Sequence, residues 1–196
     1  MHRRHNPVRR ARSRGRQEGS ALLEFAIALP LLVVFIVGIY DFSGAFNTKL
    51  KIQHAAQLGA VLAAAQPTSD LDPANSTPGP GSLLPVAAVV FNSLNDDGVL
   101  PLASPTGTCK PPAVSVSNAP PLLQWTYVVS GCPDTLTIVI NRSATAGSGP
   151  VAVGTTVQVQ YPYHWRFNSA IQLLFPGASY AAITTLTEEA TVHNQN

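Results

Sequence analysis

The sequence predicts an α+β fold in which one long N-terminal helix, passing through a membrane, packs on a small antiparallel sheet of about four strands. Two observations predict it. Residues 21–40 are almost uninterruptedly apolar, and no proline follows between positions 31 and 66. From residue 113 onward, β-branched runs alternate with turn residues. Only 11% of the 196 residues are charged, which disfavours coiled coils, basic nucleic-acid folds and large enzyme barrels.

The basic residues are concentrated at the N-terminus. Seven of the twelve lie in the first sixteen positions, and beyond Tyr40 there are five basic and eight acidic residues. This asymmetry predicts a cytoplasmic N-terminus and a C-terminal domain on the periplasmic side. A basic tail can bind nucleic acid, but this one adjoins an apolar segment without interleaved aromatic residues. We therefore expect a lipid bilayer, and no nucleic acid, as its partner.

The apolar run Ala21–Tyr40 is long enough to cross a bilayer as a helix. Its one ionisable residue is Glu24, and Pro30 is tolerated more easily in a membrane helix than in a soluble one. A secretory signal peptide is the main alternative, because it also has a basic start and an apolar stretch. The length of the run and the carboxylate inside it favour a retained membrane helix.

Glu24 is unfavourable in this setting, since a central intramembrane acid costs roughly 2.5–3.5 kcal/mol on insertion scales. It lies only four residues into the run, so a snorkelling surface residue is one interpretation. The other is that processing supplies a counter-charge. Cleavage between Gly19 and Ser20 would remove the arginine-rich leader and give Ser20 an ammonium group, one helical turn from Glu24.

The junction Glu18–Phe25 resembles the processing site of Flp-type prepilins and pseudopilins, in which a peptidase cleaves after a glycine and glutamate is the fifth mature residue. Residues 19–65 are similar to the TadE-like family of the tight-adherence (Tad) pilus and secretion system. The matching details are Glu24-Phe25, Leu29-Pro30-Leu31-Leu32, Gly38 before Asp41-Phe42, and the small, glutamine-containing run from Gln53. Toward the end of the chain the likeness is only general.

The resemblance implies a pseudopilin, or minor pilin, of the bacterial inner membrane that assists assembly of a Flp-type pilus. Its processing site would comprise Gly19, Ser20, Glu24 and Phe25. It implies as partners a prepilin peptidase, the Flp-type pilin and other pseudopilins, the Tad membrane platform and the secretion ATPase. An unprocessed single-pass membrane protein with a periplasmic interaction module is the alternative, and a secreted β-rich protein cut by signal peptidase is a third.

We expect the leader to end at residue 19 and the helix to span residues 20–65. Its apolar side would include Phe42, Phe46, Leu50 and Ile52, and its wetted side Asp41. That apolar side must pack on the chain's own sheet, on a neighbouring subunit, or on both. Residues 66–82 are rich in proline and glycine and predict a linker.

Residues 83–196 would form the periplasmic α+β domain. A short helix is predicted over 85–94, and Asn95-Asp96-Asp97-Gly98 ends it. Candidate strands cover residues 113–117, 123–130, 135–141, 155–163 and 181–193. Residues 144–149 would connect two strands, and 167–175 would form a short helix.

Cys109 and Cys132 are the two cysteines. On the periplasmic side disulfides persist, so we expect a bridge, with two unpaired core thiols as the alternative. No cysteine or histidine lies at zinc-ligand spacing, and Asp96-Asp97 lacks the spacing of a calcium loop. The sequence also lacks the common catalytic motifs, so it predicts no enzyme, metal or cofactor. The aromatic group from Tyr161 to Phe167 is either a contact surface or core packing.

Overall fold

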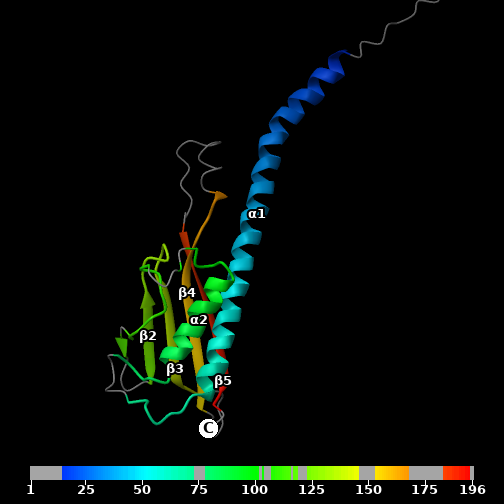
Figure 1. The fold of residues 1–196 in the computed structure, drawn as a ribbon. Coiled ribbons are helices and arrows are strands. Elements are labelled where there is room, and N and C mark those ends of the chain that lie inside the picture. The colour runs from blue at the N-terminus through cyan, green and yellow to red at the C-terminus, as the bar shows by residue number, and fades with distance from the viewer. Residues whose placement is uncertain are drawn as a thin grey trace, which may run out of the picture.

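A computed structural model describes residues 15–72, 78–101, 103, 107–115, 117–118, 123–145, 153–167 and 183–194. Its elements, in chain order, are α1 (Gly15–Ala65), α2 (Leu84–Asp96), β1 (Ser117–Asn118), β2 (Gln124–Val129), β3 (Leu136–Thr145), β4 (Val153–His164) and β5 (Ile183–His193). Figure 1 shows α1 as a long rod whose C-terminal half packs on the sheet and whose N-terminal half extends away from it. The predicted α+β class is confirmed.

The long helix α1 runs through the whole apolar segment and on to Ala65, as predicted, and begins five residues before Ser20. Its 51 residues correspond to about 76 Å. Pro30 lies inside it and has no N–H to donate to the carbonyl of Ala26. Every residue from 19 to 33 is exposed, so this part of the helix is not packed against the described part of the domain.

The five strands form one antiparallel sheet in the order β1-β2-β3-β4-β5, each strand pairing with its neighbours along the chain. Four strands are long and β1 has two residues. The predicted strand over 113–117 was wrong: residues 113–115 belong to no strand, and pairing is confined to Ser117 and Asn118. Prolines at 111, 112, 120 and 121 flank this stretch, and proline cannot donate to a ladder.

Both helices cover the same face of the sheet, and the hydrophobic core lies between the helices and the sheet. The α1 side of this core is made of small residues, among them Ala55, Ala56 and Ala60, all fully buried. Gly59 is the tightest point: a Cβ there would lie 2.5 Å from Val90 Cγ2 of α2 and 3.2 Å from Val157 Cγ1 of β4. Larger side chains fill the rest, chiefly Trp125 and Tyr127 from β2.

The predicted short helix is confirmed as α2, and Lys51 of α1 holds its C-terminal end by donating to the Asp97 carbonyl at 2.7 Å. Residues 66–72 and 78–82 contain no helix or strand, and Gly79 makes a turn with φ of +90°. Residues 73–77 of the predicted linker lie outside the described residues. So do most of the predicted 144–149 connection and all of the predicted 167–175 helix except Phe167.

A buried arginine fixes the end of α1 to the sheet. Arg142 lies within an irregularity of the β3–β4 pairing, between Asn141 and Ala144, and is almost completely buried. Its Nη2 donates to the Gln66 carbonyl at 3.0 Å, immediately after the last residue of α1. A cation at this position stabilises the negative end of the helix dipole. Burial lowers the pKa of Arg142.

Candidate functional site

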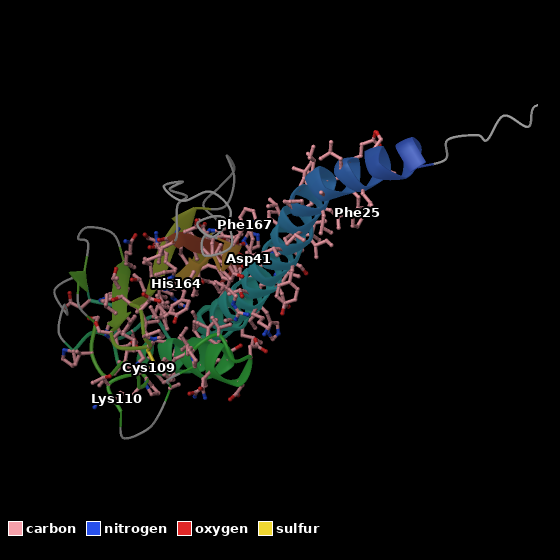
Figure 2. All side chains as sticks on the ribbon, turned by 90° about the horizontal axis from the view of Figure 1, so that it is seen from above. Phe25, Asp41, Cys109, Lys110, His164 and Phe167 are labelled. Carbon is pink, nitrogen blue, oxygen red and sulfur yellow. A yellow bond between two sulfur atoms is a disulfide. The ribbon has the colours of Figure 1, made fainter. Side chains whose placement is uncertain are left out.

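The four predicted processing residues lie together on the free half of α1. Gly19, Ser20, Glu24 and Phe25 are all exposed, and no atom lies within 4 Å of the position that a Cβ on Gly19 would occupy. Figure 2 shows Phe25 far along the helix from the sheet. A peptidase therefore meets no obstruction from the folded domain at this point.

Ser20 and Glu24 lie on the same face of the helix. The Ser20 hydroxyl donates to Glu24 Oε1 over 3.4 Å. Because the α-amino group of a residue lies close to its own side chain, a new N-terminus at Ser20 would bring an ammonium group near the carboxylate. Opposite charges at this spacing attract each other on a helix surface, and more strongly where water is excluded.

The surface around Glu24 is apolar. The large side chains from Leu22 to Tyr40 are mostly exposed, and the helix is long and apolar enough to cross a membrane. A soluble protein rarely leaves so large a contiguous apolar surface uncovered. Helix length, composition and exposure together indicate a membrane anchor.

A second group of functional side chains lies where α1 meets the sheet. Asp41, the first residue after the apolar run, is 3% exposed. Its Oδ2 accepts the Phe167 N–H at 2.7 Å, and its Oδ1 accepts the Tyr163 hydroxyl at 3.1 Å. This carboxylate thus attaches α1 to the end of β4 across more than 120 residues of sequence. We call Asp41, Tyr163 and Phe167 the helix–sheet clamp.

Gly44 makes the clamp possible. A Cβ on Gly44 would lie 2.8 Å from the Tyr163 hydroxyl oxygen, so any larger residue would obstruct its approach to Asp41. Burial, followed by the hydrogen bond to Asp41, raises the pKa of Tyr163 above its ordinary value. The hydroxyl therefore stays protonated and remains a donor at neutral pH.

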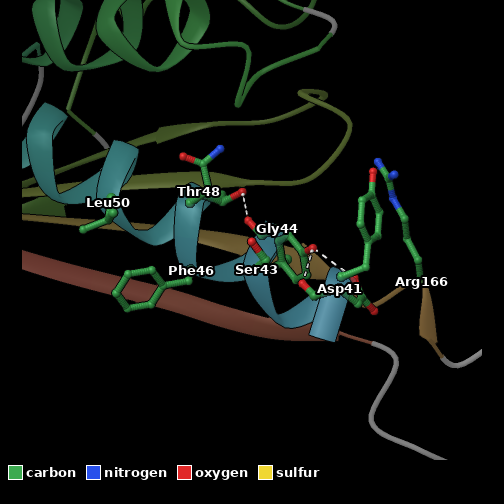
Figure 3. Close-up of a pocket in the computed structure, with 10 residues that line it drawn as sticks. Asp41, Ser43, Gly44, Phe46, Thr48, Leu50 and Arg166 are labelled. Atoms are coloured by element: carbon green, nitrogen blue, oxygen red, sulfur yellow. Dashed lines mark hydrogen bonds between the residues drawn. The ribbon is translucent and has the colours of Figure 1, made fainter. Parts of the chain in front are cut away.

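A cleft of about 570 Å³ lies beside the clamp, between α1 and the end of β4. Figure 3 shows Asp41, Gly44 and Arg166 around it, with Phe46 and Leu50 farther along the helix. Its lining combines hydroxyl and amide groups with the Asp41 carboxylate, the Arg166 cation and the apolar side chains of Phe46 and Leu50. Such a lining can bind a partner through both polar and apolar contacts.

The structure corrects two expectations for the part of α1 that directly follows the apolar run. Asp41 was expected on the wetted side and is instead buried. Phe42, Phe46 and Leu50 were expected to share a packed side with Ile52, but they are half to two-thirds exposed, whereas Ile52 is fully buried. The sheet contacts the face with Ala45 and Ile52, because small residues there allow close approach.

The cysteines form the disulfide Cys109–Cys132, and both are buried. The nearby Tyr161 hydroxyl donates to the Cys132 carbonyl. The aromatic group divides between the two interpretations: Tyr161 is core, whereas His164 is exposed and pairs with Asp134 at 2.6 Å. Among the described residues, no group of three or more His, Cys, Asp or Glu side chains is placed to hold a metal ion.

Comparison with known families identifies the helix. Residues 19–61 match the family model described as TadE-like protein. The helical segment of this chain is TadE-like. The match begins at the predicted cleavage glycine, lies entirely within α1 and includes Asp41 and Gly44. No curated protein and no solved structure matches the chain.

The TadE-like match confirms the resemblance found in the sequence. It supports a membrane-anchored, pilin-like protein of the Tad system. The predicted processing residues lie close together in the sequence and can be proposed from it alone. The helix–sheet clamp was not visible from the sequence, because Asp41 lies more than 120 positions before Tyr163 and Phe167. The one local signal was that an acid, Asp41, directly follows the apolar run.

Proposed function

We propose that this chain is a TadE-like pseudopilin, a minor pilin that assists assembly of a Flp-type tight-adherence pilus or secretion system. A prepilin peptidase would remove residues 1–19. The C-terminal domain, residues 83–196, would then stand on the periplasmic side of the inner membrane. The partners would be the peptidase, the Flp-type pilin, other pseudopilins, the membrane platform and the secretion ATPase.

One observation carries the proposal: Ser20 and Glu24 lie in hydrogen-bond contact on an exposed apolar helix directly after Gly19. Cleavage at Gly19 removes the basic leader and places a cation beside the acid in the same step. An ordinary membrane anchor has no use for a carboxylate in this position, where it opposes insertion.

The extended exposure of α1 supports assembly as the role. Phe42, Phe46 and Leu50 follow the predicted membrane segment and extend its exposed apolar surface along one face of α1. Apolar side chains at i, i+4 and i+8 match the surface that a neighbouring helix would cover. A helix that served only as an anchor would need no such surface outside the lipid.

The experiment compares Gly19→Arg with Gly15→Arg in cells that contain the prepilin peptidase. Both substitutions add a cation to the leader side, but only the first alters the predicted cleavage site. We expect Gly19→Arg to keep the full length of the chain and to fail in restoring pili to a deletion strain, while Gly15→Arg behaves as wild type. Shortening of the Gly19→Arg chain to the wild-type mature length would overturn the proposal.

The alternative is an unprocessed single-pass protein with a periplasmic interaction module. The separate core and the disulfide are compatible with such a module. So is a hollow on the sheet that is lined mainly by polar side chains, among them Gln124, Asn141 and Gln158. Under this alternative neither arginine substitution changes the length of the chain, and the wild-type protein retains its leader.

A further inference from the structure

The β4–β5 ribbon extends beyond the rest of the sheet toward the membrane segment. The last β4 residue paired with β3 is Gln160, whereas β4 and β5 remain paired to His164 and Ile183. Figure 1 shows this end of β4 rising beside α1. Among the described residues of the domain, those directly after β4, namely Trp165, Arg166 and Phe167, therefore lie toward the free half of α1.

Phe167 contacts α1 inside the segment predicted to lie in lipid. Its Cε2 is 4.0 Å from the position that a Cβ on Gly38 would occupy, and it lines an apolar hollow with Phe35 and Ile39. Figure 2 places Phe167 close to Asp41 at the side of the helix. Gly38 is about 26 Å along the helix from Ala21, within the ~30 Å hydrocarbon core.

The neighbouring side chains have the chemistry of a membrane interface. Trp165 packs edge to face on Tyr163, with ring centroids 5.2 Å apart, and its indole N–H donates to Thr184 Oγ1. Ile183, beside them at the start of β5, is 53% exposed. Aromatic rings with one polar end are enriched at the level of lipid headgroups.

Arg166 adds a cation at the same level. It is exposed, and it makes no hydrogen bond or ion pair within the part of the chain that the structure describes. The two lysines that follow the membrane segment on α1 are already engaged, by Glu188 and by the Asp97 carbonyl. Arginine binds phosphate oxygens through paired N–H groups.

We infer that Trp165, Arg166 and Phe167 form a second membrane contact, seated on the phospholipid headgroups of the leaflet from which α1 emerges. The aromatic side chains would enter the interface, and Arg166 would bind a lipid phosphate. The helix–sheet clamp holds this surface at a fixed height on α1. The inference rests on α1 crossing the bilayer, which is part of the proposed function.

The test uses the two tryptophans of the full chain. Trp125 is fully buried in the core, so a fluorescence quencher in the lipid acts mainly on Trp165. The chain is reconstituted at a high lipid-to-protein ratio into equal mixtures of phosphatidylcholine and phosphatidylglycerol. Quenching by lipids brominated near the headgroup is then compared between the wild type and Trp165→Phe, after flotation of the vesicles.

We expect strong quenching in the wild type and its loss in Trp165→Phe. Equal quenching in the two proteins, in vesicles that float with the protein, would overturn the membrane contact and leave α1 as a membrane helix. Failure of the protein to float with the vesicles would instead remove the membrane premise of the proposed function.

A charge variant tests the role of Arg166. Arg166→Glu is expected to lose most of the Trp165 quenching in the anionic vesicles, because the carboxylate is repelled by lipid phosphate. Lys110→Glu is the matched control, since Lys110 is also exposed but lies beside Cys109, at the side of the domain away from Phe167 (Figure 2). Equal quenching in the two variants would overturn the assignment of a lipid phosphate to Arg166.

Discussion

Glu24 and Asp41 are two acids near the two ends of the same apolar segment, and their surroundings differ completely. Asp41 is enclosed by the domain and accepts two hydrogen bonds. Glu24 is exposed on a surface of leucine, phenylalanine and isoleucine, with Ser20 as its neighbour. The first carboxylate is satisfied by the fold, and the second needs a partner that processing or another subunit supplies.

Glu24→Ala is therefore predicted to leave the folded domain unchanged while impairing processing or assembly. The side chain contacts only Ser20 within the described residues, so the loss of stability should be within about 0.5 kcal/mol. The readouts are the melting temperature in detergent and the number of pili restored to a deletion strain. Glu24→Asp retains the charge one methylene shorter and should restore part of the assembly. Full assembly with Glu24→Ala would make Glu24 a tolerated residue without a role.

Asp41→Ala is predicted to weaken the attachment of α1 to β4. It leaves the Phe167 N–H without its acceptor and the Tyr163 hydroxyl with only the backbone carbonyl of residue 41, which is 3.2 Å away. We expect a loss of about 1–3 kcal/mol in the free energy of unfolding. Thermal unfolding of the full chain in detergent measures this loss of stability. Asp41→Asn should lose less stability than Asp41→Ala, because an amide oxygen can still accept from one donor.

A double-mutant cycle with Tyr163→Phe separates the clamp from general destabilisation. If the two residues act through their shared hydrogen bond, the double variant loses less stability than the two single variants together. Strictly additive losses would contradict a direct interaction between Asp41 and Tyr163.

At the scale of elements, the sequence patterns predicted the parts of the fold that depend on local chemistry. Continuous apolar residues predicted the helix, and alternation of valine with polar residues predicted β4. The face of α1 that packs on the sheet was not predictable in the same way. Phenylalanine and leucine are more apolar than alanine, yet α1 buries its alanines and exposes Phe42 and Phe46.

The reason is geometric rather than hydrophobic. The α1–α2–β4 contact is so close that only small side chains fit, which a count of apolar residues does not reveal. The strand expected over 113–117 failed for a related reason, since flanking prolines limit pairing despite β-branched composition. The helix–sheet clamp was not predicted for two further reasons: its residues come from elements distant in the sequence, and one of them is a buried acid.

Gly59→Ala tests this close contact. The added methyl group would meet Val90 Cγ2 at 2.5 Å in a fully buried core, and overpacking of this kind costs about 1–3 kcal/mol. The higher helix propensity of alanine offsets up to about 1 kcal/mol of that loss. We expect a lower melting temperature for Gly59→Ala. For the control Gly81→Ala, whose Cβ would make only an ordinary contact at 3.9 Å, we expect little change. A stabilised Gly59→Ala protein would contradict the packing described here.

At the scale of the whole molecule, charge is distributed so that one cleavage would remove most of the basic residues of the chain. Residues 1–19 contain seven of the twelve basic residues, and residues 20–196 contain five basic and nine acidic ones. In the proposed topology this basic segment would hold the N-terminus on the cytoplasmic side. Its removal would leave an apolar helix without the arginine cluster, whose new N-terminal ammonium lies beside Glu24 and which is attached to a separately packed and disulfide-bonded domain. Such a molecule is suited to transfer from lipid to an apolar contact with other helices.

The most direct test of this account is the intact mass of the native protein extracted from membranes of cells that assemble the pilus. We expect a chain that begins at Ser20, with the arginine-rich leader absent. A native, assembly-competent protein whose mass includes residues 1–19 would contradict the account.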